Sequence, residues 1–155
     1  MHKHILIATD GSELSQTAVQ YGIALAKSVG ARATAITVTP SHKFAVAAGW
    51  LTDAAKQHQD RMELLAAQYL GVARDIAAAA GIQCELLHRE HDQPYQAIID
   101  VAREKLCDLI VMASHGRRGL SAVVLGSETL KVLTYSSIPV LVYRAPRRES
   151  VFVPS

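Results

Sequence analysis

The sequence contains few cysteines, and their placement argues against two classes of site. Among its 155 residues only Cys84 and Cys107 are cysteines, and they form no Cys-x-x-Cys pair. Cysteines at this spacing are not typical of a zinc site or a redox dithiol. We therefore expect both to be reduced thiols in or near the core, with no metal bound.

Long hydrophobic runs are also missing. No apolar segment approaches the roughly 20 residues of a membrane-spanning helix, and the N-terminal residues lead into a short apolar run without the features of a signal peptide. We expect a cytoplasmic protein with no membrane partner. The formal net charge is only +2, so no extended basic field favours nucleic acid as a partner.

Two common nucleotide-binding signatures are absent as well. The sequence has no Gly-x4-Gly-Lys-Ser/Thr segment, and no Gly-x-Gly-x-x-Gly follows the first apolar run. The segment from His88 to Asp92 offers His-x-x-His spacing but no further cluster at zinc spacing, and we interpret it as a polar surface loop. Dedicated catalysis and a protein metal site therefore lack support.

The sequence does contain an alternation of strand-like and helical patterns. Short apolar or alternating runs predict strands at Ile5 to Ala8, Ala33 to Val38, Ile82 to His88, Leu109 to Ala113 and Ile138 to Tyr143. Helical spacing predicts helices from the cap Ser12 to Gly30, from Asp53 to Ala80, from Pro94 to Leu106, and from Glu128 to Leu133 after the cap Ser127. This order is typical of a doubly wound α/β parallel sheet. We expect one domain over residues 1–144 and a C-terminal tail over 145–155.

The most informative stretch runs from Asp108 to Leu133. After its apolar strand come Ser114, His115, Gly116 and Arg117, and nine residues separate Gly116 from Gly126. A helix start carries unpaired N–H groups and partial positive charge, and glycines let an anion approach the backbone. The residues alone leave two interpretations open: a phosphate-binding loop, or ordinary turns and a helix entry.

A second candidate region lies at the ends of the first two predicted strands. Ligands of open parallel sheets bind beyond the carboxyl ends of the strands, where Asp10 and Val38 both lie. The Asp10 carboxylate could take ribose hydroxyls or help to hold Mg²⁺, or it could stabilise its own turn. The Val38 main chain could meet the edge of an adenine.

These features resemble the universal stress protein family, whose nucleotide-binding pattern is Gly, two residues, Gly, nine residues, Gly, then Ser or Thr. Here Ala113, Gly116, Gly126 and Ser127 occupy these positions, so the first glycine is replaced by alanine, whose methyl group would crowd a ribose or phosphate. The resemblance extends over nearly the whole chain. It implies a five-stranded parallel sheet in the order 3-2-1-4-5 with helices on both faces.

The resemblance also implies a function: a dimeric, cytoplasmic stress-response protein that binds ATP, or another adenine nucleotide, with Mg²⁺ as a sensor or switch. Phosphates would lie at the N–H groups of the loop and helix start, ribose near Asp10 and Ala113, and adenine near Val38 and Met112. The expected binding residues are Asp10, Val38, Met112, Ala113, Ser114, His115, Gly116, Arg117, Gly126, Ser127 and Glu128. The carboxylate of Glu128 repels a triphosphate, so either it points away or a cation mediates.

Two other functions stay open. One is slow ATP hydrolysis or phosphotransfer with His115 moving a proton or accepting phosphate, although no orienting carboxylate is visible. The other is a nucleotide-free, dimeric interaction protein. In the family resembled, the strand Ile138 to Tyr143 pairs with its copy in a second subunit, and an exposed apolar edge itself favours a homodimer. The segment from Ser41 to Thr52 either covers the site or packs on the following helix, and the tail is either disordered or adds a strand to a partner.

Overall fold

The computed structural model describes residues 1–41, 53–116 and 124–146. Its elements, in chain order, are β1 (His4–Ala8), α1 (Glu13–Val29), β2 (Arg32–Thr39), α3 (Asp53–Ala80), β3 (Cys84–Glu90), α4 (Pro94–Glu104), β4 (Leu109–Ala113), α5 (Ser127–Tyr135) and β5 (Val140–Tyr143). Three parts of the prediction lie outside the described residues: the expected binding residue Arg117, the segment 42–52 and the tail from residue 147. None of the described helices has the length and hydropathy needed to cross a bilayer.

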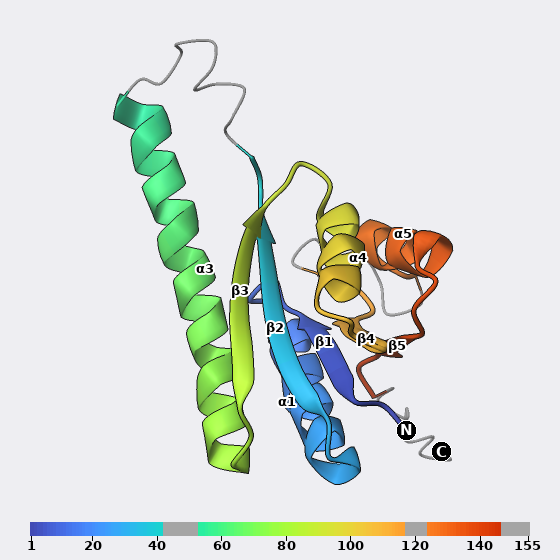
Figure 1. Ribbon diagram of the computed structural model, residues 1–155. Coiled ribbons are helices and arrows are strands. Elements are labelled where there is room, and N and C mark those ends of the chain that lie inside the picture. The colour runs from blue at the N-terminus through green and yellow to red at the C-terminus, as the bar shows by residue number, and fades with distance from the viewer. Residues whose placement is uncertain (42–52, 117–123, 147–155) are drawn as a thin grey trace, which may run out of the picture.

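The five strands form one parallel sheet in the order β3-β2-β1-β4-β5, which confirms the predicted topology (Figure 1). Ile7 in β1 pairs with Ala35 in β2 and with Val111 in β4. The chain leaves β1 toward β2 and leaves β4 toward β5, so the two crossovers diverge from adjacent central strands. Doubly wound folds bind ligands at this switch point.

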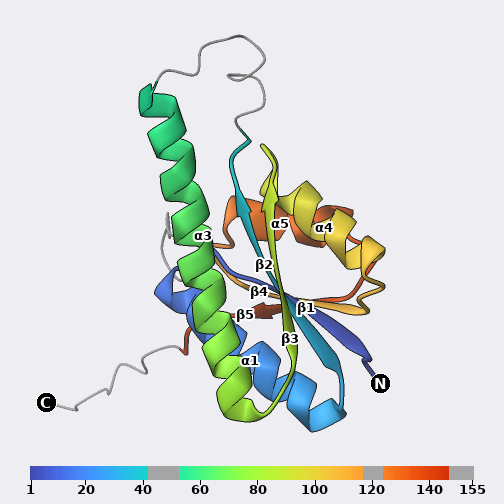
Figure 2. The same ribbon diagram turned by 60° about the vertical axis from the view of Figure 1, so that its left-hand side comes forward.

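Helices cover both faces of the sheet (Figure 2). On one face α1 and α3 bury a cluster that includes Ile7, Ile23 and Val111. On the other, α4 and α5 bury a cluster that includes Leu6 and Val132. Alternate residues of β1 and β4 enter opposite clusters, so β4 is apolar throughout and β1 is apolar from Ile5 onward, as a sheet buried on both faces requires. The first residue of β1, His4, is buried with both ring nitrogens in hydrogen bonds.

The first helix shows how local sequence sets its ends. Ser12 has extended backbone geometry, and its hydroxyl accepts a hydrogen bond from the Ser15 N–H at 3.2 Å. Gly30 ends the helix with a φ of 71°, a left-handed geometry that glycine adopts without cost. Both caps were predicted from the sequence, and they fix where the chain leaves β1 and enters β2.

The end of α4 differs from the prediction. Leu106 was expected on the apolar face of this helix, but α4 ends at Glu104 and Leu106 is 83% exposed with a φ of 55°. The Leu106 N–H donates to the Arg103 carbonyl at 3.1 Å, and the Cys107 N–H donates to the Ala102 carbonyl at 2.8 Å. These two bonds form a Schellman ending, which turns Leu106 outward and places Cys107 in the core.

The bounds of the third strand also differ from the prediction. It was expected from Ile82 to His88 and runs from Cys84 to Glu90, so Arg89 and Glu90 belong to the strand and not to a loop, while its position at the sheet edge is as predicted. The His88 ring shares a hydrogen bond with the Thr39 hydroxyl of β2 at 2.7 Å, and the His91 ring accepts the Gln93 N–H at 2.9 Å. Both imidazoles thus have hydrogen-bond partners within the fold. Within residues 1–41, 53–116 and 124–146 no cluster of three or more metal-binding side chains occurs.

Candidate functional site

The loops that follow β1 and β4 meet at the switch point. The Asp10 carboxylate accepts the Ser12 N–H through Oδ1 at 3.0 Å, which closes a turn after β1. Its other oxygen, Oδ2, lies so close to Gly116 that a Cβ on Gly116 would overlap it. The carboxylate therefore joins two expected binding residues that are distant in the sequence, and it also serves its own turn.

The start of α5 is seated on the same loop. Ser114 is buried, its N–H donates to the Tyr143 carbonyl at 2.8 Å, and its carbonyl accepts the Gly126 N–H at 2.7 Å. A Cβ on Gly126 would lie 3.1 Å from the His115 Cα, closer than most side chains tolerate. Glycine at this position thus lets the helix start approach the β4 loop.

This contact corrects two details of the expected phosphate loop. The N-cap of α5 is Gly126 and not Ser127, because the Gly126 backbone is extended and its carbonyl accepts the Leu130 N–H at 3.0 Å. The Gly126 N–H is also occupied by the Ser114 carbonyl, so it does not face a ligand. In the described part of the chain the N–H groups of Ser127 and Glu128 have no acceptor, as expected for the first turn of a helix.

The side chain of Glu128 points away from this helix start. Its Oε2 accepts the Tyr95 N–H of α4 at 2.9 Å, and its Oε1 lies 3.5 Å from the Lys131 ammonium. Of the two alternatives that the sequence left open, this is the one in which the carboxylate turns outward. The positive end of α5 is therefore not covered by its own acidic residue.

The remaining expected residues line the end of the central strands. Met112 and Ala113 are buried at the end of β4. Val38, near the end of β2, packs against the core cluster that contains Met112. The Ala113 carbonyl accepts the Thr129 hydroxyl at 2.8 Å, a second link between β4 and α5. Because Ala113 is buried, its methyl group lies largely within the protein.

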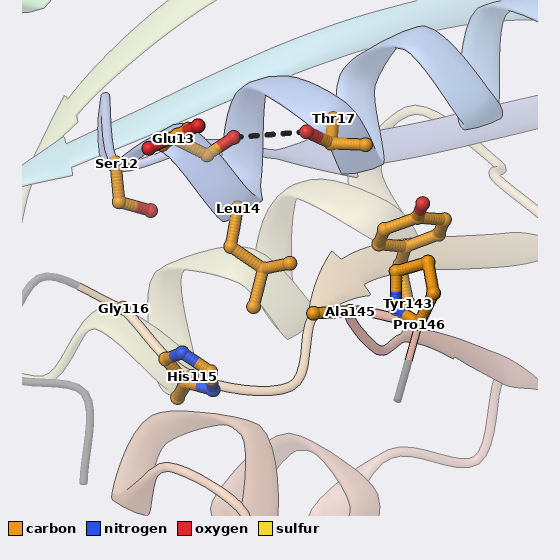
Figure 3. A pocket seen from close by; sticks show the side chains of 9 residues that line it. All are labelled: Ser12, Glu13, Leu14, Thr17, His115, Gly116, Tyr143, Ala145 and Pro146. Carbon is orange, nitrogen blue, oxygen red and sulfur yellow. Dashed lines mark hydrogen bonds between the residues drawn. The ribbon is translucent and has the colours of Figure 1, made fainter. Parts of the chain in front are cut away.

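His115 stands between the loop and an open cavity. Its Nδ1 lies 3.2 Å from the Ser114 hydroxyl, and in the described part of the chain no carboxylate orients the ring. The cavity, of about 490 Å³, opens on the α1 side of the switch point (Figure 3). Its lining residues are Ser12, Glu13, Leu14, Thr17, His115, Gly116, Tyr143, Ala145 and Pro146.

Among the described residues, the cavity and the expected site share His115 and Gly116 alone. The candidate site lies at the strand ends and the α5 start, where the Asp10 turn, the β4 loop and N–H groups without an acceptor among the described residues lie close together. The cavity walls are mainly the first turns of α1 and the end of β5. Sequence reasoning missed Tyr143 as a wall of the cavity, because its strand pattern carries no signal for such a role. Helical spacing could have indicated that Leu14 and Thr17 lie on one side of α1 and line the same cavity, since they are three residues apart just after the Ser12 cap.

Tyr69 is a further residue that supports the site. A Cβ on Gly11 would overlap the Tyr69 ring, so α3 packs directly against the turn that carries Asp10. Gly11 also has a φ of 78°, a left-handed geometry that favours glycine. Helical spacing placed Tyr69 on the apolar face of α3, but only the fold shows that this face reaches the turn.

Comparison with known proteins agrees with this architecture. The model of the Universal stress protein family matches residues 1–144. Universal stress protein MJ0531 of Methanocaldococcus jannaschii is 30% identical over 154 residues, covering 96% of this chain and 86% of that protein. The structure of protein MJ0577, from the same organism, is similar with a TM-score of 0.80 at 22% identity over 95% of this chain and 99% of that one.

A universal stress protein solved in complex with cAMP is also similar, with a TM-score of 0.69 at 25% identity over 94% of this chain and 99% of that one. The family match spans every described strand and helix. The chain therefore belongs to the universal stress protein family.

Proposed function

We propose that this stress protein binds an adenine nucleotide, ATP with Mg²⁺, at the switch point, and acts in a cytoplasmic homodimer as a sensor or switch. One observation carries the proposal: Gly126 seats the α5 start on Ser114 and His115, beside the Asp10–Gly116 contact. N–H groups that have no acceptor among residues 1–41, 53–116 and 124–146 thus lie close to a carboxylate. The cAMP complex of a relative at 25% identity supports an adenine ligand.

Each part of the nucleotide has a proposed partner. Phosphates would bind the N–H groups of Ser127 and Glu128 at the positive end of α5, together with Gly116 and Arg117 of the loop. Ribose hydroxyls would lie near Asp10 and Ala113. The adenine would lie over the ends of β2 and β4, with its polar edge on the Val38 main chain and its face near Met112.

The residues present also fit Mg²⁺ carried by the nucleotide. This ion is bound through one or two carboxylates plus substrate phosphates and keeps several waters, so it needs no protein cage. The Asp10 carboxylate and the Ser127 hydroxyl are the oxygen groups suited to this role. Bound Mg²⁺ would screen phosphate charge from Glu128.

The proposed dimer uses the free edge of β5. The four residues of this strand are only partly buried, and no described strand covers its outer edge. The carbonyls of Pro139 and Tyr143 bind β4, so strand alternation turns the N–H groups of Val140 and Val142 outward. Val142→Pro should therefore remove one outward donor and yield monomers by light scattering, whereas Val142→Ala should remain dimeric; a monomeric parent protein would contradict the dimer.

Slow ATP hydrolysis remains the alternative. The His115 ring is bonded to the Ser114 hydroxyl and not to a carboxylate, so it lacks the orienting group that a strong general base uses. We expect His115→Ala to weaken nucleotide binding modestly. Turnover by the parent protein that disappears in this variant would favour the enzyme instead.

Calorimetric titration of nucleotide-stripped protein tests the proposal. We expect heat on adding ATP with Mg²⁺, and loss of that heat in Gly126→Asp, whose side chain would start 3.1 Å from the His115 Cα and bring a carboxylate to the α5 start. Gly71→Asp is the matched control, because a Cβ there meets only the end of the Arg74 side chain at 3.7 Å. The absence of heat with ATP and AMP in the parent protein would overturn the proposal.

A further inference from the structure

Glu128 is an acidic residue in the first turn of the helix that, by the proposed function, holds phosphate. A carboxylate in the first turn of a helix is attracted to its own helix start, where the N–H groups and the dipole stabilise negative charge. It would then occupy the site meant for the ligand. In this structure the Glu128 side chain instead reaches α4, and two groups bind its carboxylate.

The first group that holds it is the backbone of α4. The N-cap of α4, Gln93, makes no side-chain capping bond, which leaves an N–H at the helix start in need of an acceptor. The Glu128 Oε2 fills this need by accepting the Tyr95 N–H at 2.9 Å, across 33 residues of sequence. One carboxylate therefore caps a neighbouring helix and not its own.

The second group is Lys131, one turn along α5. Its ammonium lies 3.5 Å from the Glu128 Oε1 and 5.5 Å from the centre of the Tyr95 ring. The Tyr95 ring in turn lies 5.5 Å from the ring of Tyr135, near the end of α5. The start of α4 is thus held to α5 by a hydrogen bond, a cation and an aromatic contact, all near the Glu128 carboxylate.

We propose that the Tyr95 N–H and Lys131 are positioning groups that hold the Glu128 carboxylate away from the α5 start and so keep this helix terminus open for phosphate. The inference rests on the proposed nucleotide function and adds a residue-level condition to it. It requires that release of the carboxylate lowers the affinity for a ligand, and lowers it more for ligands that carry more phosphate charge. It also links phosphate binding at α5 to the start of α4.

Shortening Glu128 tests this condition. Glu128→Asp keeps the charge but is one methylene too short to reach Tyr95, so its carboxylate falls back on the α5 start. We expect ATP with Mg²⁺ to bind about five- to tenfold more weakly, a change of about 1–1.4 kcal/mol that suits a partly screened like-charge contact. The affinity for AMP should fall less, and adenosine should bind as in the parent protein.

Two further variants separate charge from structure. Glu128→Gln keeps the length without the charge and should bind ATP somewhat more tightly than the parent. Lys131→Ala should lower the affinity for ATP by about two- to threefold, since an exposed ion pair at this spacing on a helix contributes little free energy. Glu63→Asp makes the same exchange at an exposed site on α3 and serves as the matched control.

The outcomes are distinct. Weaker ATP binding with unchanged adenosine in Glu128→Asp supports the inference, and Lys131→Ala supplies the same test should Glu128→Asp fail to fold. Equal weakening of ATP and adenosine, or unchanged ATP binding, overturns the inference and leaves the proposed function standing. A parent protein that binds neither ATP nor AMP overturns the proposed function, and this inference with it.

Discussion

Substitution of Gly116 by alanine tests the contact between the two loops of the site. Gly116 does not have a positive φ, so alanine can adopt its backbone geometry without strain. The added Cβ would overlap the Asp10 Oδ2 and lie 3.4 Å from the Asp10 Cγ. The carboxylate must therefore rotate, and its Oδ1 must give up the 3.0 Å hydrogen bond from the Ser12 N–H.

The size of the effect follows from this one bond. A hydrogen bond to a charged group contributes about 1.5–3 kcal/mol when well buried. Asp10 is only partly buried, so we expect the free energy of unfolding to fall by about 1 kcal/mol. Because the displaced carboxylate is also the proposed ribose ligand, the Kd for ATP should rise by roughly tenfold, or about 1.4 kcal/mol.

Urea denaturation and calorimetric ATP titration measure the two effects. Gly71→Ala is the matched control, since its Cβ meets only the Arg74 Nη2 at 3.7 Å inside helix α3. That variant should gain about 0.5–1 kcal/mol of stability from helix propensity and bind ATP as the parent does. A Gly116→Ala protein with the parent's affinity for ATP would refute the role assigned to Asp10.

Two further predictions concern the opposite end of the sheet. Burial opposes ionisation of Asp108, but the N–H groups of Lys3 and His4 and the nearby His2 outweigh it and hold the pKa of this carboxyl below its usual value of 3.8. A lowered folded-state pKa stabilises the fold at neutral pH, and this contribution is lost as the pH falls through the folded-state pKa. Asp108→Asn should therefore unfold at lower urea at pH 7, with a difference of about 1 kcal/mol or less that shrinks below about pH 4; a difference independent of pH would contradict this. Burial, aided by the Asp108 charge, raises the pKa of the Cys107 thiol to about 11. At pH 8 only about one thiol in a thousand is then ionised, so iodoacetamide should label Cys107 far more slowly in folded than in unfolded protein; mass spectrometry showing equal rates would contradict its burial.

Much of the fold could be predicted from sequence because several elements carry their period over their whole length. The helix Asp53–Ala80 and the strand Leu109–Ala113 have the predicted bounds. The strand order came from the family resemblance, and the structure confirms it. Gly30 was recognisable because a glycine after the last apolar helical position is a common helix ending.

The differences arise where backbone hydrogen bonds decide the ends of an element. Ser127 is a good cap by residue type, but the hydrogen bond from Gly126 to Ser114 starts the helix one residue earlier. Leu106 fits the apolar period of α4, yet the backbone bonds of the helix ending turn it outward. Neither contact has a local sequence signal.

The geometry of the candidate site could be predicted only in part for the same reason. The spacing from Gly116 to Gly126 indicated a loop that returns to a helix start, and the fold brings Gly126 onto His115. The direction of the Glu128 side chain depends on how α4 packs on α5, and its partner is a backbone N–H, which no residue type identifies. Packing of Tyr69 on Gly11 likewise depends on the path of α3 across the sheet.

The most direct test of the nucleotide site is a titration of ¹⁵N-labelled protein with ATP and Mg²⁺, followed by NMR through the backbone amides. We predict the largest shifts at Gly116, Ser127 and Glu128, with smaller shifts near Asp10 and Val38, and a response at the Tyr95 amide that Glu128 accepts. Shifts confined to the cavity around Thr17 and Tyr143, or no shifts at all, would contradict a phosphate site at the start of α5.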